Sequence, residues 1–150
     1  PQAMHALHLR SPHGVVVNGS PLVTPERVML AWDESAASAK AAHEALPFLK
    51  AAAEIEIAAF DPKIATAGGP EQPGANLAAW LSHHGCRVAL SHLPSGGREI
   101  GLAMLARAEA TGADLIVLGA YGHSRLQQAV FGGNTRPLLE QTQVMTLFAH

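Results

Sequence analysis

The sequence predicts an α/β protein in three layers, with a parallel sheet between two layers of helices. Two observations lead to this prediction. Short apolar runs alternate with longer, alanine-rich segments through most of the 150 residues. Several of these runs also lack the polar alternation of a sheet that faces water, and such continuous apolar strands are typical of parallel sheets covered on both faces. The length suits one domain with its own core.

The start of the chain is predicted to stand apart from this domain. Residues 1–13 have no periodicity and are interpreted as a tail, residues 14–20 predict a very short strand closed by a turn, and residues 21–25 predict a linker. We therefore assign residues 1–25 to an N-terminal tail with one extra strand, and residues 26–150 to the domain.

The first strand and helix of the domain follow directly. Residues 27–32 predict a buried strand, and residues 35–53 predict an alanine-rich helix with Ser35 as its N-cap. Pro47 lies inside this helix and lacks a backbone N–H, so we expect the helix to kink or end near Leu46.

The remaining elements alternate in the same way. In residues 54–60 the Glu-Ile-Glu-Ile alternation predicts a strand toward a sheet edge. The other predicted elements, in order, are a Gly/Pro-rich loop at 61–73, a helix at 75–84 stopped by Gly85, a strand at 87–93, a helix at 99–110 closed by Gly112, a strand at 113–118, a helix at 135–141 capped by Asn134 or Thr135, and a last strand at 144–149.

The composition excludes several classes of protein. Ten Lys and Arg residues are scattered and the net charge is −2, which argues against nucleic acid as the main partner. Cys86 is the single cysteine, which excludes an internal disulfide and fits a reducing cytoplasm. No apolar stretch reaches the roughly 18 residues that span a bilayer, so we expect no membrane partner.

Glycines follow the most apolar strand. Gly119 and Gly122 come directly after it, and Gly132 and Gly133 form a second pair. Glycine lets backbone N–H groups approach a ligand, and successive N–H groups form a concave site for phosphate oxygens. A helix beginning after the second pair would add its positive N-terminal end. The pattern indicates a nucleotide or other anion at the carboxyl edge of the sheet; a tight loop whose glycines serve only turn geometry explains it equally well.

The spacing Gly119-x2-Gly122-x9-Gly132 resembles the ATP-binding signature of the universal stress protein family, and residues 28–35 resemble the family's first strand with its aspartate. The resemblance covers residues 26–149. It implies a Rossmann-like, five-stranded parallel sheet of order 3-2-1-4-5 and an adenine-nucleotide site.

Two segments depart from the single-domain pattern of this family. Residues 14–19 resemble the closing strand of a preceding copy, and at residues 61–73 a Gly/Pro loop replaces part of the second helix. The resemblance therefore implies either the second half of a tandem-type member or a divergent single-domain member.

The resemblance places the nucleoside at the ends of the first two strands. Asp33 would bond the ribose hydroxyls or the adenine amino edge, Ala31 and Trp32 would supply backbone contacts, and Phe60 would pack on the adenine. Alternatively, Asp33 only caps the following helix, and Phe60 is a plain core aromatic residue.

The resemblance places the ribose and phosphates of ATP, with or without Mg²⁺, on a second group of residues. These are Gly119, Ala120, Tyr121, Gly122, Arg125, Gly132, Gly133, Asn134 and Thr135. Arg125 would reach a phosphate or remain solvated. The family signature has Ser or Thr where this chain has Gly133, and the missing hydroxyl weakens phosphate binding by about 1 kcal/mol. Thr135 would supply a substitute hydroxyl.

No catalytic or metal-binding motif accompanies these residues. The Gly-x-Ser-x-Gly elbow and the Gly-Lys-Ser/Thr of a P-loop are missing, and the adjacent His83 and His84 cannot easily chelate one ion. The leading hypothesis is a cytoplasmic stress-response module that binds ATP and regulates, without catalytic residues. The alternatives are an ATP-independent dimerisation or interaction module of the same fold, and a slow ATP hydrolase.

The apolar character of the last predicted strand indicates that the chain associates with a second copy. Residues 144–149 are nearly continuous in apolar character, and a sheet that ends on such a strand leaves an edge prone to pairing. The resemblance implies a homodimer, or a tandem pseudo-dimer, through this edge. Residues 14–19 would be the partner strand of a second copy, or would cover the edge within one chain and leave a monomer.

Overall fold

The computed structural model describes residues 15–18, 24–62, 72–119 and 144–149. The strands are β1 (Val15–Asn18), β2 (Arg27–Ala31), β3 (Glu54–Phe60), β4 (Val88–Leu93), β5 (Leu115–Gly119) and β6 (Met145–Ala149). The helices are α1 (Ala36–Glu44), α2 (Leu46–Ala51), α3 (Ala75–His83) and α4 (Ile100–Thr111). The helix predicted at 135–141 lies outside the described residues.

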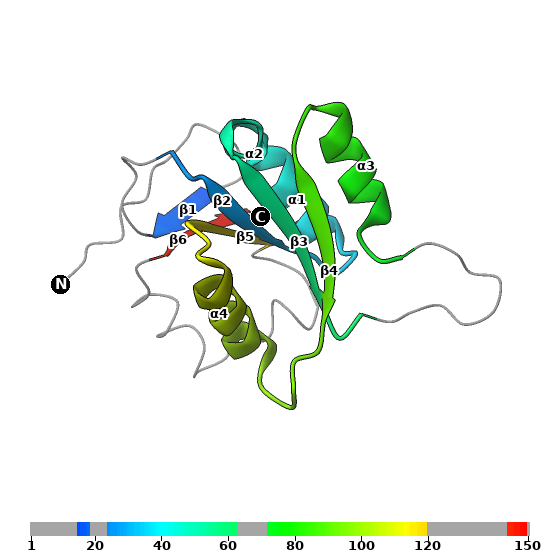
Figure 1. The fold of residues 1–150 in the computed structure, drawn as a ribbon, viewed down its shortest axis with the longest axis vertical. Coiled ribbons are helices and arrows are strands. Elements are labelled where there is room, and N and C mark those ends of the chain that lie inside the picture. Colours follow the sequence, from blue (N-terminus) through cyan, green and yellow to red (C-terminus); the bar gives the residue numbers. More distant parts are fainter. Residues whose placement is uncertain (1–14, 19–23, 63–71, 120–143, 150) are drawn as a thin grey trace.

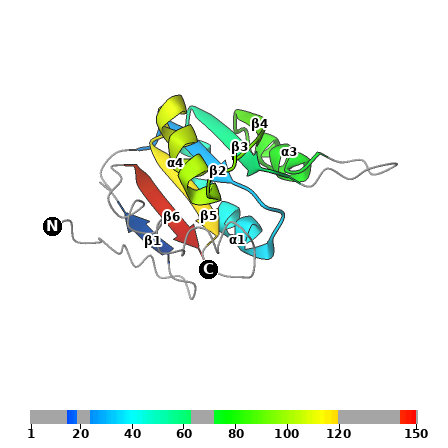
Figure 2. The ribbon, with the colours of Figure 1, turned by 90° about the horizontal axis from the view of Figure 1, so that it is seen from below.

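These strands form one sheet with helices on both sides (Figures 1 and 2). Their order is β1-β6-β5-β2-β3-β4. The strands from β2 to β6 are mutually parallel. Numbered from β2, they have the order 3-2-1-4-5, so the predicted fold class is confirmed. Within the described ranges, no helix has the length and apolar character needed to cross a membrane.

The helix predicted at residues 35–53 is divided into α1 and α2 close to Pro47, as the sequence predicts. Helix α1 ends just before Ala45, and Pro47 lies in the first turn of α2, where a missing N–H breaks no helical hydrogen bond. Ser35 caps α1, since its Oγ accepts a hydrogen bond from the Ser38 N–H at 3.1 Å. Both predictions are confirmed.

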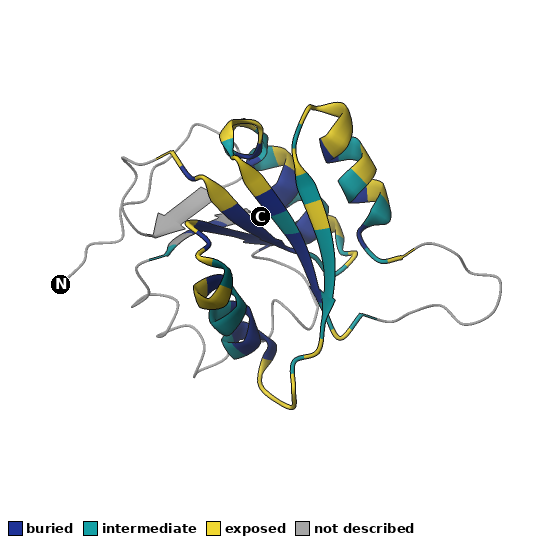
Figure 3. Cartoon of the chain, viewed as in Figure 1, coloured by how far each residue is buried: buried dark blue, intermediate teal, exposed yellow. Residues whose placement is uncertain are grey.

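Two apolar cores lie on opposite faces of the sheet. Helices α1, α2 and α3 pack on one face, around Leu30, Leu49 and Ile57. Helix α4 packs on the other face, where Met29 and Met104 belong to a second core. Neighbouring residues of β2 point to opposite faces, so this strand contributes to both cores. Figure 3 shows the buried residues concentrated in the middle of the sheet, whereas β4 has no fully buried residue.

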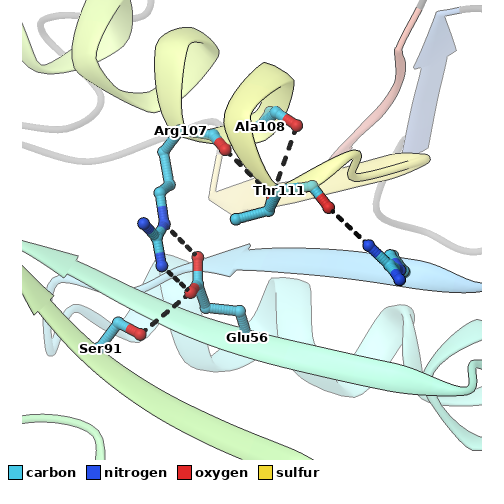
Figure 4. Close-up of polar contacts among 6 residues, drawn as sticks. Glu56, Ser91, Arg107, Ala108 and Thr111 are labelled. Carbon is cyan, nitrogen blue, oxygen red and sulfur yellow. Dashed lines mark hydrogen bonds and ion pairs between the residues drawn. The ribbon is translucent and has the colours of Figure 1, made fainter.

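β3 lies next to the outermost strand, between β2 and β4, as the order 3-2-1-4-5 implies, although it is not itself the edge strand. Its half-buried Glu56 is accommodated because Arg107 of α4 donates two hydrogen bonds to it, at 3.0 and 2.6 Å. The Ser91 Oγ donates a third at 3.0 Å (Figure 4). Hydrogen bonding from Arg107 is the main reason that the pKa of Glu56 lies below its ordinary value of 4.5.

The N-terminal strand covers the edge of the last strand within one chain. β1 pairs antiparallel with β6, with Val15 opposite Ala149 and Asn18 opposite Thr146. This is the pairing that the monomer alternative required. The oligomeric state itself stays a prediction.

We expect Glu56→Gln to lower the free energy of unfolding at pH 7 by about 1 kcal/mol, because it removes the negative charge from the Glu56–Arg107 ion pair. The loss is modest because solvent partly screens the charge of Arg107. The folded pKa of Glu56 is depressed, so its stabilisation is present above pH 4.5 and is lost as the pH falls through the folded pKa. Urea unfolding of parent and variant, at pH 7 and at a pH well below 4.5, measures this difference. Glu54→Gln is the control, since the Glu54 side chain is 60% exposed; equal losses in both variants would contradict the assignment.

Candidate functional site

The carboxyl ends of β2, β3, β4 and β5 meet at one edge of the sheet, because these strands are parallel. This edge brings together five residues of the predicted site: Ala31, Trp32, Asp33, Phe60 and Gly119. The other predicted residues lie outside the described part of the chain: Ala120, Tyr121, Gly122, Arg125, Gly132, Gly133, Asn134 and Thr135. The described residues therefore include all of the predicted nucleoside group and, of the predicted phosphate group, Gly119.

Asp33 is engaged with the first turn of α1. Its Oδ1 accepts a hydrogen bond from the Ser35 N–H at 3.0 Å and another from the Ser38 hydroxyl. These contacts place the carboxylate beside the N-cap residue Ser35. They support the alternative that Asp33 serves the start of the following helix. A contact with a nucleoside stays a prediction.

The backbone next to Asp33 belongs largely to the sheet. Ala31 is 1% exposed and lies opposite Ala58 of β3. The Trp32 N–H donates to the Ala58 carbonyl oxygen at 2.9 Å, so this donor is already used within the sheet. The Trp32 ring packs against the core formed with α1 and α3.

Phe60 lies on the opposite face of the sheet from Trp32. It is half-buried and packs against the core beneath α4. The interpretation of Phe60 as a core aromatic residue therefore has structural support, and its packing on adenine stays a prediction.

Gly119 is required by helix packing. A Cβ built on it would lie 2.6 Å from the carbonyl carbon of Ala37 and 2.8 Å from the Ala37 oxygen. The backbone of α1 thus approaches β5 so closely that only glycine fits. For this glycine, close approach of a helix explains the residue without a ligand.

We expect Gly119→Ala to lower the free energy of unfolding by about 2–3 kcal/mol, because the new methyl group overlaps helix backbone that cannot easily move. Gly97→Ala is the control. Gly97 has a φ of +79° but no atom within 4 Å of a built Cβ, so its cost of about 1 kcal/mol comes from backbone conformation alone. Thermal or urea unfolding compares the two variants, and a loss at Gly119 no larger than that at Gly97 would contradict the packing account.

Two further residues at this edge were not predicted from the sequence. Glu34 follows Asp33 with a φ of +62°, and Asp61 follows β3 with a φ of +46°. Non-glycine residues in this left-handed region cost of order 1–3 kcal/mol and occur preferentially at functional sites. The one sequence signal is an acidic residue directly after an apolar strand. It does not predict the positive φ of Glu34, because Glu, unlike Asp, rarely adopts this conformation.

Both carboxylates hold backbone of a distant segment. Glu34 Oε1 accepts a hydrogen bond from the Gly74 N–H at 2.8 Å, 40 residues away. Asp61 Oδ1 accepts one from the Ser95 N–H at 3.0 Å, 34 residues away. The loops at the carboxyl edge are thereby tied to one another by side chains.

Among the described residues, no cluster of three or more His, Cys, Asp or Glu side chains could hold a metal ion. A cavity of about 500 Å³ lies at the opposite, amino-terminal edge of the sheet, lined by residues that include Arg27, Glu54 and Arg87. Its lining includes both positively and negatively charged side chains. It lies at the amino ends of the strands, whereas Asp33 and Gly119 lie at the carboxyl ends.

Comparison with solved structures identifies the class of fold. A universal stress protein from Archaeoglobus fulgidus DSM 4304 matches with a TM-score of 0.58 at 19% identity, over 82% of this chain and 43% of that one. A universal stress protein in complex with cAMP matches with a TM-score of 0.54 at 16% identity, over 85% and 99% of the two chains. A member of the family from Burkholderia pseudomallei gives a TM-score of 0.51 at 17% identity, over 73% and 91%.

The chain therefore has a universal stress protein-like fold. It spans less than half of the Archaeoglobus fulgidus DSM 4304 protein, but nearly all of the cAMP-bound one. No protein-family model and no curated protein sequence matches it.

Proposed function

We propose that the chain is a cytoplasmic, adenine-nucleotide-binding module of the stress-response type, which binds ATP and has no dedicated catalytic residues. One observation carries the proposal: in a universal stress protein-like fold, the spacing Gly119-x2-Gly122-x9-Gly132 begins at the carboxyl end of β5. Asp33 follows β2, which pairs with β5, at the same edge. One structural neighbour is a universal stress protein in complex with cAMP, so this fold holds an adenine nucleotide in that protein.

In this proposal the two ends of the ligand meet different chemistry. The nucleoside lies near Asp33 and the Trp32 carbonyl, both at the carboxyl end of β2. The phosphates, with or without Mg²⁺, lie along the glycine loops from Gly119 to Gly133. Backbone N–H groups suit phosphate oxygens there, because they are donors that carry partial positive charge. Binding is weak, in the micromolar range or above, since Gly133 supplies no hydroxyl.

A second candidate function is an interaction module of the same fold that works without ATP. Three observations favour it. Gly133 stands where the family signature has a hydroxyl, Gly119 is accounted for by contact with Ala37, and Asp33 is already bonded to the start of α1. In this case the carboxyl edge is a structural junction, and the chain acts through its surfaces.

Calorimetry with ATP and Mg²⁺ tests the two candidates. We expect the parent to bind in the micromolar range or more weakly, and Gly133→Ser to bind about fivefold more tightly, which corresponds to about 1 kcal/mol from one added hydrogen bond. Gly133→Ala is the matched control, because it adds a Cβ without a hydroxyl and should not tighten binding. Failure of both parent and Gly133→Ser to bind would contradict the nucleotide module and favour the interaction module.

We further propose that the chain assembles through the edge of β6, as a homodimer or as a pseudo-dimer with an attached second copy. β1 is antiparallel to β6, unlike every other pair in the sheet, and only four residues long. In a homodimer β1 would cross to the partner and keep the same hydrogen bonds.

Sedimentation of the chain, and of a variant lacking residues 1–20, tests this assembly. We expect the full chain to sediment as a dimer through exchange of β1. Removal of residues 1–20 exposes the β6 edge and should still permit edge-to-edge association. Clean monomers in both samples would contradict the proposal.

A further inference from the structure

We propose that Glu34 is a positioning residue of the carboxyl edge. Its carboxylate accepts a hydrogen bond from Gly74, the N-cap residue of α3, and so connects the turn after β2 to this helix and sets where Trp32 and Asp33 lie. This inference rests on the proposed function, because it assigns how the nucleoside end of that site is held in place.

The backbone of Glu34 is the first observation. Its φ of +62° belongs to the left-handed region, which Gly, Asn and Asp adopt more readily than Glu. A residue persists in such a conformation only where its surroundings compensate. The 2.8 Å hydrogen bond from the Gly74 N–H to Glu34 Oε1 is the compensating contact, and its acceptor is a carboxylate, which strengthens it.

Gly74, the donor of this hydrogen bond, has close contacts of its own. Gly74 is buried with a φ of +88°, and a Cβ on it would lie 2.7 Å from Leu90 Cδ1 and 3.2 Å from Ile57 Cγ2. The preceding carbonyl oxygen, that of Pro73, lies 3.0 Å from Nε2 of His92 in β4. Gly74 is therefore fixed against β3 and β4, and the Glu34 contact transmits their position to the turn after β2.

The same contact serves α3. Gly74 is the N-cap residue of this helix and makes no side-chain cap hydrogen bond. The Glu34 carboxylate accepts the N-cap N–H, as the glutamate of a capping box does, but from a segment 40 residues earlier. A negative charge beside the first turn also suits the positive end of the helix.

Glu34 affects the site because it is the next residue after Asp33 in the sequence. On one side, Asp33 is held by the Ser35 N–H at the start of α1. On the other side, Glu34 is held by Gly74, and Trp32 Cδ1 lies 3.5 Å from the Cβ position of Gly74. The turn thus spans from α1 to α3. Loss of the Glu34 tie should shift the Asp33 carboxylate and weaken its hydrogen bond with Ser35.

Amide hydrogen exchange of the Ser35 and Gly74 N–H groups, followed by NMR, tests this role without any ligand. In Glu34→Gly, which removes the carboxylate and the backbone strain together and should fold well, we expect both amides to exchange at least tenfold faster than in the parent. Glu34→Gln retains an acceptor oxygen and should change both rates less. Calorimetry should show about fivefold weaker ATP binding in Glu34→Gly.

Asp61→Gly is the matched control. It also replaces an acidic, left-handed residue after a strand, but the Asp61 carboxylate holds Ser95. We expect it to leave the Ser35 and Gly74 amides unchanged, which separates the Glu34 tie from a general loosening of the edge.

Unchanged exchange at Ser35 in Glu34→Gly overturns the positioning role, as does equal acceleration in Asp61→Gly. Faster exchange with unchanged ATP affinity also overturns it, because the tie would then be purely structural. A parent that binds no ATP refutes the proposed function alone. The exchange rates then decide whether Glu34 places Asp33.

Discussion

The carboxyl edge of this sheet depends on the close approach of α1 to β5. At Gly119 the strand has no side chain, and Ala37 of the helix occupies the space where a Cβ would stand. This spacing brings the N-terminus of α1, with Ser35 and Asp33, next to the end of β5. The ends of β2 and β5, from which the two segments of the proposed nucleotide site continue, are neighbours because the two strands pair in parallel.

Most of the fold could be predicted because its signals are local. Ser35 and Pro47 mark helix boundaries through their own backbone chemistry, and the described strands follow apolar runs that can be read directly. The pairing of Glu56 in β3 could not be predicted in this way. Its charge is balanced by Arg107, 51 residues later, and no local pattern shows that pairing.

The site was predicted less completely than the fold, for the same reason. The sequence left Asp33 and Phe60 with two interpretations each, and the structure adds that Asp33 bonds to the start of α1 and that Phe60 packs beneath α4. Glu34 was missed, because its role comes from a positive φ and a partner across β3. Among the described residues, the turn that carries Asp33 is thus held from two sides, at the start of α1 and at Gly74.

The proposed function requires that an adenine nucleotide binds at the carboxyl edge. Mapping backbone amide shifts by NMR during titration of the full chain with ATP and Mg²⁺ tests it most directly. If the nucleotide binds there, saturable shifts should gather at residues 33–35 and in the segment 119–135. Shifts confined to the opposite edge, around the cavity lined by Arg27, Glu54 and Arg87, would contradict it, as would no saturable shift anywhere in the chain.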